Sequence, residues 1–209
     1  MKDFAKTTFI FLRHGEPVGG KIFRGSTDDP LTAKGWLQMQ QSVDGLMFDE
    51  IVSSPLKRCI EFSTHVIKSN AYPLTIMDEI QELHLGDWEG LSALEVEQQD
   101  AEALKHFWAA PESFTPPNGE AFNDFEKRIL LAWDSLNQKY VADEQSKKIL
   151  VVCHAGVMMV LLKKLLNIPV ENILCIKLNY ASKVRVEMHA KKYNLKPQIF
   201  IEHGYSFDE

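Results

Sequence analysis

Thr7-Thr8-Phe9-Ile10-Phe11-Leu12-Arg13-His14-Gly15 is an unbroken β-branched and apolar run that ends abruptly in an arginine, a histidine and a glycine. Such a run is typical of a central strand that is buried on both faces of its sheet. In open α/β sheets, ligands bind at the carboxyl ends of the strands. Arg13 and His14 are therefore the first candidates for a functional site.

Two further segments end in the same way. Residues 148–156 read Lys-Ile-Leu-Val-Val-Cys-His-Ala-Gly, and a helix is expected to begin at His154-Ala155-Gly156, with free N–H groups that can face an anion. Residues 51–58 read Ile-Val-Ser-Ser-Pro-Leu-Lys-Arg and place Arg58 in the first turn of a helix that follows another strand. If these strands are neighbours, two imidazoles and two guanidinium groups converge on one crevice.

The order of the predicted elements gives the fold class. Apolar runs predict strands at 7–12, 50–53, 74–77, 148–153 and 199–201, and helical spacing predicts helices at 31–47, 55–68, 92–110, 122–136 and from 154 to near 167. This alternation indicates an α/β fold, a three-layer α/β/α sandwich with a mostly parallel central sheet. Residues 184–188 alternate apolar and polar, as an exposed-face or edge strand does. We expect one domain over residues 1–209, with a lid-like insertion at about 82–120.

The converging groups suit phosphoryl transfer, which requires positioning and neutralisation of charge. Arg13 and Arg58 can each offer forked donors to phosphate oxygens. A neutral His14 is a competent nucleophile toward phosphorus, and a carboxylic acid must protonate the departing alcohol. Glu82, which follows the third strand among apolar neighbours, is the preferred acid, but the sequence does not separate it from Glu79, Asp87 and Glu89.

Composition limits the partners and the compartment. The net charge of −6 lacks the basic excess of a nucleic-acid or anionic-membrane binder. The cysteines Cys59, Cys153 and Cys175 form no pair at metal-ligand spacing and no even disulfide set, and the N-terminal apolar run is too short for a signal peptide. We therefore expect a cytoplasmic protein whose partner is a small phosphorylated metabolite, and a homodimer stays open.

Four motifs in order resemble the histidine phosphatase superfamily, which has the phosphoglycerate mutase-like fold. They are Arg13-His14-Gly15-Glu16, residues 53–58, Glu82 before Gly86-Asp87-Trp88-Glu89-Gly90, and Val152-Cys153-His154-Ala155-Gly156. The resemblance implies that His14 is the nucleophile that becomes phosphorylated and that Glu82 is the proton donor. It implies no metal and no cofactor in this step.

The resemblance also implies a phosphate pocket formed by Arg13, Arg58 and a protonated His154. Arg24 and Gly25 fall where members of the family line the pocket, and Ala155 is expected at its edge. Many members carry a Trp-Asn pair where this chain has Gly19-Gly20, so we expect Arg24 or a backbone amide to replace that phosphate contact.

Residues 19–36 are most similar to the α-ribazole phosphatases of cobalamin biosynthesis. The best substrate prediction is accordingly α-ribazole 5′-phosphate, with another sugar or nucleotide phosphate as the alternative. A phosphoglycerate mutase is a further alternative, although it needs a long closing lid and tail. The least favoured alternative is a non-catalytic relative that binds a phospho-ligand.

Several residues have plain structural interpretations. His84 lies beside Glu82 and is interpreted as packing rather than as pocket rim. Cys153 is expected to be a small apolar core residue. The aromatic residues of the insertion are expected to form helix-face core rather than to stack on a leaving group: Trp88, Phe107, Trp108 and Phe114.

Overall fold

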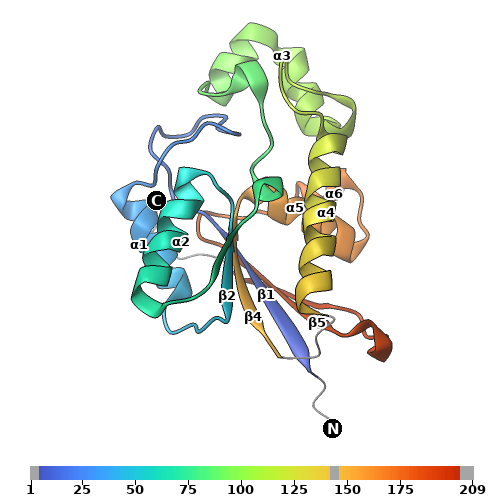
Figure 1. Cartoon of the computed structure of the whole chain (residues 1–209). Helices are drawn as coiled ribbons and strands as arrows, with labels where there is room; N and C mark the ends of the chain where they lie inside the picture. The colour runs from blue at the N-terminus through green and yellow to red at the C-terminus, as the bar shows by residue number, and fades with distance from the viewer. Residues whose placement is uncertain (1–4, 142–145, 203–209) are drawn as a thin grey trace.

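A computed structural model describes residues 5–141 and 146–202, which form a six-stranded sheet with helices packed around it (Figure 1). The strand order is β3-β2-β4-β1-β5-β6. The pairs β1/β4, β2/β4 and β2/β3 are parallel, whereas β5 is antiparallel to both of its neighbours. The mostly parallel sheet is thus confirmed. The strands are β1 (Lys6–Arg13), β2 (Glu50–Ser53), β3 (Leu74–Ile76), β4 (Lys148–Cys153), β5 (Lys183–His189) and β6 (Gln198–Glu202).

Helices cover both faces of the sheet, which confirms the three-layer sandwich. Along β1, Phe9 and Phe11 pack into one apolar core with α4 and α5, while Ile10 and Leu12 pack into another with α1 and α2. The helices are α1 (Ala33–Val43), α2 (Lys57–Asn70), α3 (Ala93–Ala109), α4 (Phe122–Tyr140), α5 (Ala155–Leu166) and α6 (Val170–Ile173), with short 3₁₀ turns at η1 (Asp78–Ile80), η2 (Gly86–Trp88), η3 (Pro111–Ser113) and η4 (Lys191–Tyr193).

The edge interpretation of residues 184–188 was wrong. They belong to β5, which lies between β1 and β6, and β6 is the edge strand. The alternation arises because one face of β5 packs into the core through Val184 and Val186, while Arg185 on the other face lies over the ring of Phe200. Alternation of apolar and polar residues indicates a strand that has one face packed against the core. A strand in the interior of a sheet can show this alternation as well as an edge strand.

Residues 82–120, named the cap below, lie above the carboxyl ends of the strands, with α3 at the top of Figure 1. A capping box begins α3, because the Ser92 side chain accepts from Glu95 N and the Glu95 side chain accepts from Ser92 N. The cap has an apolar core of its own, formed by Leu85, Trp88, Val96 and Phe107.

No helix within residues 5–141 and 146–202 is both long enough and apolar enough to cross a membrane.

Candidate active site

The register of β1 and β4 brings two histidines together. Arg13 lies opposite Cys153, so His14 and His154 are the next residues beyond the ends of two paired strands. The backbone N–H of His14 donates to the carbonyl of Cys153 at 3.0 Å, and the two imidazole centroids are 5.2 Å apart. Both side chains are buried. The convergence predicted from the two strand-end motifs is present.

His14 has one ring nitrogen engaged and one available. Its Nδ1 lies 2.8 Å from the carbonyl oxygen of Gly15, which can only accept, so the proton is on Nδ1 and the lone pair is on Nε2. Burial, followed by the charges of Arg13 and Arg58, holds the pKa of His14 well below its ordinary value. The ring is therefore neutral, which is the form that can act as a nucleophile.

Close packing beneath the loop after β1 requires glycine at position 15. A Cβ on Gly15 would lie 2.1 Å from the carbonyl oxygen of Gly35, in the first turn of α1. The same turn begins at Thr32, whose side chain accepts from Gly35 N at 2.9 Å. The loop that carries His14 consequently rests directly on the start of α1.

His154 stands at the N-cap position of α5 and lies beside His14, although it is not among the residues that line the cavity described below. Its Nε2 lies 2.8 Å from the hydroxyl of Ser54, and its Nδ1 is buried with no hydrogen-bond partner among the described residues. Burial, followed by the charges of Arg58 and His14, lowers the pKa of His154 well below its ordinary value. In the ligand-free protein the ring is thus neutral, and it can donate from Nδ1 while Ser54 donates to Nε2. The protonated form beside a bound phosphate stays a prediction.

Two arginines complete this group of donors. Arg58 is fully buried, and its Nη1 and Nη2 donate to the carbonyls of Thr27 and Gly25, each at 2.6 Å. Arg13 donates from Nη1 to the carbonyl of Leu178, and its guanidinium lies 4.4 Å from the ring centroid of Tyr180. The Nε of each arginine is buried without a partner in the described part of the chain. Each side chain is thus held by its Nη groups and retains a free donor.

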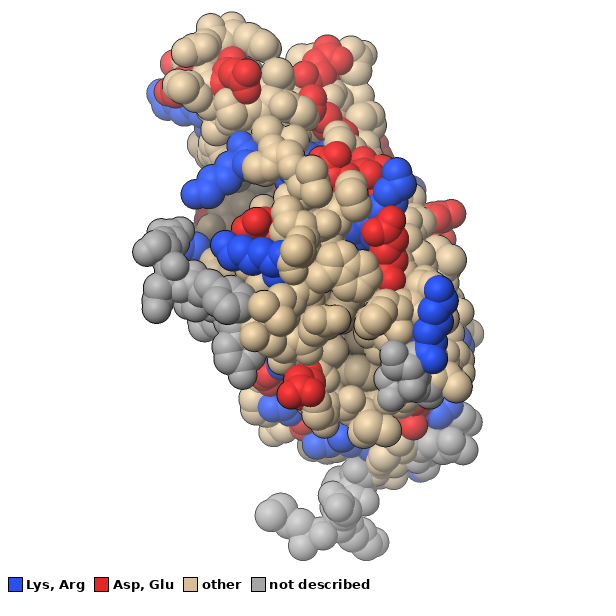
Figure 2. All heavy atoms as spheres, turned by 90° about the vertical axis from the view of Figure 1, so that its left-hand side faces the viewer, with Lys and Arg blue, Asp and Glu red and all other residues tan. Residues whose placement is uncertain are grey.

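A cavity of about 580 Å³ joins these groups to an apolar chamber. Arg13, His14, Arg58 and Glu82 line one part of it. The rest of the wall is mainly apolar and includes Ile22, Phe23, Leu83, Leu85, Phe107, Trp108, Pro111, Phe122, Phe125, Met159, Val160, Val170, Ile173 and Leu174. Figure 2 shows a hollow on the side of the molecule that bears α1 and α2, with basic side chains above and below it.

Glu82 is the one acid of the four alternatives that lines this cavity. Its Oε1 accepts from Leu83 N at 3.0 Å, and its Oε2 accepts from Gly156 N at 3.2 Å, at the start of α5. Glu79 and Asp87 are exposed, and Asp87 accepts two bonds from Asn118. Geometry therefore favours Glu82 over the alternatives that the sequence left open.

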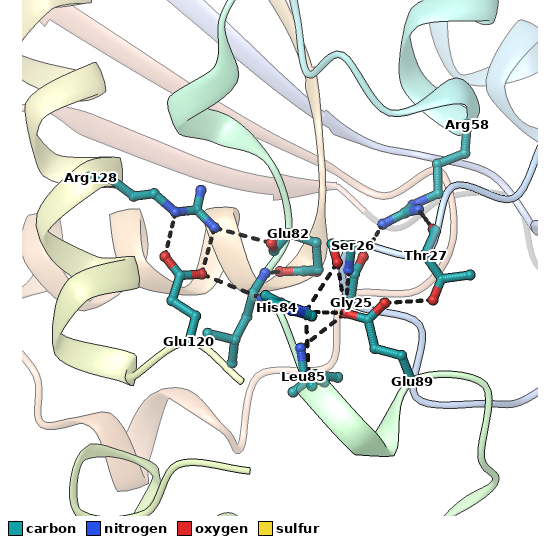
Figure 3. A network of polar contacts seen from close by, with 12 residues as sticks. Gly25, Ser26, Thr27, Arg58, Glu82, His84, Leu85, Glu89, Glu120 and Arg128 are labelled. Carbon is teal, nitrogen blue, oxygen red and sulfur yellow. Dashed lines mark hydrogen bonds and ion pairs between the residues drawn. The ribbon is translucent and has the colours of Figure 1, made fainter. Parts of the chain in front are cut away.

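Glu89, the fourth alternative, is a structural hub (Figure 3). Its Oε1 accepts from Ser26 N, Ser26 Oγ, His84 Nδ1 and Leu85 N at 2.8 to 3.0 Å, and its Oε2 accepts from Thr27 Oγ1 at 2.5 Å. Burial by itself would raise the pKa of Glu89, but these hydrogen bonds outweigh it and hold the pKa at about 2. Glu89 ties the loop before α1 to the segment that carries Glu82.

Arg24 and Gly25 both line the cavity, as expected. Arg24 also has a structural role, since it pairs with Asp29 at 2.9 Å and donates to the carbonyls of Val18 and Gly20. Gly25 adopts a positive φ of 48°, and a Cβ there would lie 2.3 Å from Glu89 Oε1. Which group replaces the Trp-Asn contact stays a prediction.

Three expectations for neighbouring residues need correction. Ala155 begins α5, but the cavity wall contains the next residue, Gly156. His84 is half exposed and bonded to Glu89 rather than packed in a core. Phe107 and Trp108 line the cavity, whereas Trp88 and Phe114 pack in the cap as predicted.

Sequence reasoning missed two residues of this site and the role of a third. Tyr180 lines the cavity beside His14 and Arg13, and Arg128 donates to the segment that carries Glu82. Glu89 was named only as a possible acid, whereas it joins two segments by hydrogen bonds. Arg128 gives a weak signal, because it is a charged residue that falls among the apolar positions Phe125, Ile129 and Ala132 of its helix. Within the described residues, histidines, cysteines and carboxylates form no group of three or more that could hold a metal ion.

Comparison with known proteins agrees with this site. The family model for the histidine phosphatase superfamily (branch 1) matches residues 9–198. The chain is 32% identical over 167 residues to the adenosylcobalamin/alpha-ribazole phosphatase of Escherichia coli K12, covering 77% of this chain and 79% of that protein. It is 25% identical over 204 residues to a 2,3-bisphosphoglycerate-dependent phosphoglycerate mutase of Bartonella bacilliformis, covering 93% and 98%. The crystal structure of the alpha-ribazole phosphatase from Shigella flexneri superposes with a TM-score of 0.78 at 26% identity, covering 94% of this chain and 96% of that one. With two strand-end histidines beside buried arginines, and a match that runs through nearly the whole chain, this protein belongs to the histidine phosphatase superfamily.

Proposed function

We propose that this protein hydrolyses small phosphate monoesters through a phosphohistidine at His14, with α-ribazole 5′-phosphate as its leading substrate. The observation that carries the proposal is the neutral His14, whose Nε2 is left free by the Nδ1 bond to Gly15. Near it lie three buried donors that have no partner among residues 5–141 and 146–202, namely Arg13 Nε, Arg58 Nε and His154 Nδ1. A tetrahedral dianion supplies acceptors for those donors.

The first step transfers the phosphoryl group. His14 Nε2 forms a bond to phosphorus while the ester P–O bond breaks, and Glu82 gives its proton to the departing alkoxide. Arg13, Arg58 and the Nδ1–H of His154 donate to the non-bridging oxygens and balance their charge. In the second step Glu82 takes a proton from a water molecule, the water oxygen bonds to phosphorus, and the P–N bond breaks to release phosphate and free His14.

The apolar chamber supports the choice of alcohol. α-Ribazole is a nucleoside with an aromatic benzimidazole base, and Phe107 and Trp108 offer aromatic surface to such a base. The leaving group of a phosphoglycerate mutase, by contrast, is a small and charged acid, which gains little from an apolar wall. The similarity to an alpha-ribazole phosphatase supports the same choice.

The test is a phosphate-release screen combined with trapping of the phosphoenzyme. The panel contains α-ribazole 5′-phosphate, sugar phosphates, nucleotides, 3-phosphoglycerate and p-nitrophenyl phosphate. We expect α-ribazole 5′-phosphate to give the highest kcat/KM and His14→Ala to abolish both turnover and the acid-labile phosphoenzyme. His106→Ala, which changes an exposed histidine of α3, is the matched control and should retain activity.

Three outcomes would overturn parts of the proposal. Activity of His14→Ala above about a thousandth of the parent would exclude His14 as the nucleophile. Isomerised 3-phosphoglycerate without net release of phosphate would indicate a mutase. A folded protein that binds monoesters but releases no phosphate from any of them would indicate a non-catalytic relative.

A further inference from the structure

Glu82 lies on a segment that has no regular secondary structure to fix its backbone. Residues 81–85, between the short turns η1 and η2, form neither helix nor strand. Such a segment leaves carbonyl groups without ladder partners, and partly buried carbonyls need donors from elsewhere. The position of a proton donor on this segment therefore depends on other parts of the chain.

Arg128 of α4 supplies those donors. Its Nη1 donates to the carbonyls of Glu79 and Gln81 at 2.6 and 2.8 Å. Its Nη2 donates to the carbonyl of Glu82 at 3.1 Å, and this bond is drawn in Figure 3. The two remaining N–H groups donate to the carboxylate of Glu120 at 2.7 and 2.8 Å. All five donors of the guanidinium are thus used, three of them on the residues that lead to and include Glu82.

Glu120 holds the same segment from its other side. Its backbone N–H donates to the carbonyl of His84 at 2.8 Å, and its Oε2 accepts from His84 N at 3.4 Å. Arg128 and Glu120 together contact the chain on both sides of Leu83. The guanidinium of Arg128 is itself fixed from below, 4.7 Å from the ring centroid of Phe125, which lines the cavity.

We propose that Arg128, oriented by Glu120, is a positioning residue that holds the Glu82 carboxyl at the leaving-group oxygen. This inference rests on the proposed role of Glu82 as proton donor. Arg128 does not line the cavity and acts only through the backbone of residues 79–82. Lysine keeps the charge but offers a single nitrogen, which cannot reproduce a fork that spans three carbonyls and a carboxylate.

The leaving group distinguishes positioning from general destabilisation. An alkyl phosphate needs the proton from Glu82, whereas p-nitrophenolate leaves without one. We expect Arg128→Lys to lower kcat/KM, which reports the first phosphoryl transfer, by about 10- to 100-fold for the alkyl ester, because a displacement of about 1 Å has an effect of that size. The loss in kcat/KM with p-nitrophenyl phosphate should stay below about 3-fold. Glu120→Gln, which keeps one oxygen acceptor, should show the same pattern with a smaller loss.

A double variant makes the test decisive. In the Glu82→Gln background, Arg128→Lys should cause no further loss with the alkyl ester, because the group that it positions has been removed. Arg185→Lys is the matched control, since Arg185 also pairs with carboxylates but lies on β5 away from the cavity, and it should leave both substrates unchanged.

The results separate the two proposals. Equal losses in kcat/KM with both leaving groups for Arg128→Lys, or a further loss in kcat/KM in the Glu82→Gln background, would overturn the positioning role. If Glu82→Gln itself lowers kcat/KM equally for both leaving groups, the proton donor was misassigned and the proposed mechanism fails at that step. If Arg128→Lys does not fold, Glu120→Gln provides the same comparison.

Discussion

Replacement of Glu89 by glutamine tests whether the hub holds the site together. The substitution keeps the size of the side chain but removes the charge and turns one acceptor oxygen into an NH₂ donor. Five hydrogen-bond donors from residues 26, 27, 84 and 85 now point at this carboxylate. An amide cannot accept all of them, so some buried donors lose their partner.

The size of the effect follows from the lowered pKa of Glu89. Its value of about 2 against an ordinary 4.5 means that the folded state favours the carboxylate, and each pKa unit corresponds to about 1.36 kcal/mol. The lowered pKa thus corresponds to about 3 kcal/mol of stabilisation of the folded state. Solvent screening reduces this value, since the Glu89 side chain is 12% exposed. We therefore expect Glu89→Gln to lower the free energy of unfolding by about 2 to 3 kcal/mol at pH 7.

The sign of the pH dependence is fixed by the same shift. Because the folded-state pKa is lowered, the contribution is complete above pH 4.5 and is lost as the pH falls toward 2. The difference in the free energy of unfolding between parent and variant should therefore stay nearly constant from pH 7 to about pH 5 and narrow below about pH 4.5. Urea denaturation followed by circular dichroism measures this difference in the free energy of unfolding. Glu97→Gln, which changes an exposed residue of α3, is the control. A gap below about 0.5 kcal/mol at pH 7, or one that widens at pH 4, would refute the reasoning.

Three further predictions concern the nucleophile loop, the buried histidines and the chamber. Gly15→Ala should cost at least about 2 kcal/mol of stability in urea denaturation, because the added Cβ meets a backbone oxygen at 2.1 Å; an unchanged midpoint would contradict this. Because the folded-state pKa values of His14 and His154 are lowered, the unfolded chain takes up protons first, and stability should fall as the pH drops below about 6.5, by up to about 1.4 kcal/mol per pH unit for each ring. The free energy of unfolding of His154→Gln should therefore fall less steeply than that of the parent between about pH 6.5 and 5. Equal slopes of the two stability curves would argue against a lowered pKa of His154. Trp108→Ala should raise KM for α-ribazole 5′-phosphate by about 3- to 10-fold with kcat for p-nitrophenyl phosphate unchanged, and an unaltered KM would exclude a contact with the base.

The sequence was most informative where one local pattern determines both structure and site. The apolar runs before His14 and His154 identify buried strands, and parallel strands in register deliver their last residues to one edge of the sheet. The pairing of the two imidazoles could therefore be anticipated. The need for Gly15 could not, because it depends on the distance to Gly35 across the loop.

Contacts between distant segments explain most of what was missed. Arg128 meets residues 79–82 from 46 to 49 positions away, and Glu89 meets residues 26 and 27 from 62 to 63 positions away. No local spacing encodes such pairs. Trp108 was misassigned to the core for a related reason, since a cavity wall and a packed core use the same apolar side chains. Phe107 in fact does both.

The protonation of His154 depends on burial, which a motif does not report. Burial, followed by the charges of Arg58 and His14, lowers its pKa well below the ordinary value in the ligand-free protein. The fixed positive charge along the cavity wall therefore comes from arginines and Lys163.

The division of the apolar interior has an evolutionary consequence. The cap core around Val96 and Phe107 is separate from the two cores that support the strands, and Leu83, next to Glu82, is in contact with both the cap core and the core beneath α4 and α5. Substitutions in the cap can remodel the chamber for a different alcohol while the strand ends keep their geometry. Selection can in this way change the substrate specificity of the enzyme while its catalytic residues stay the same.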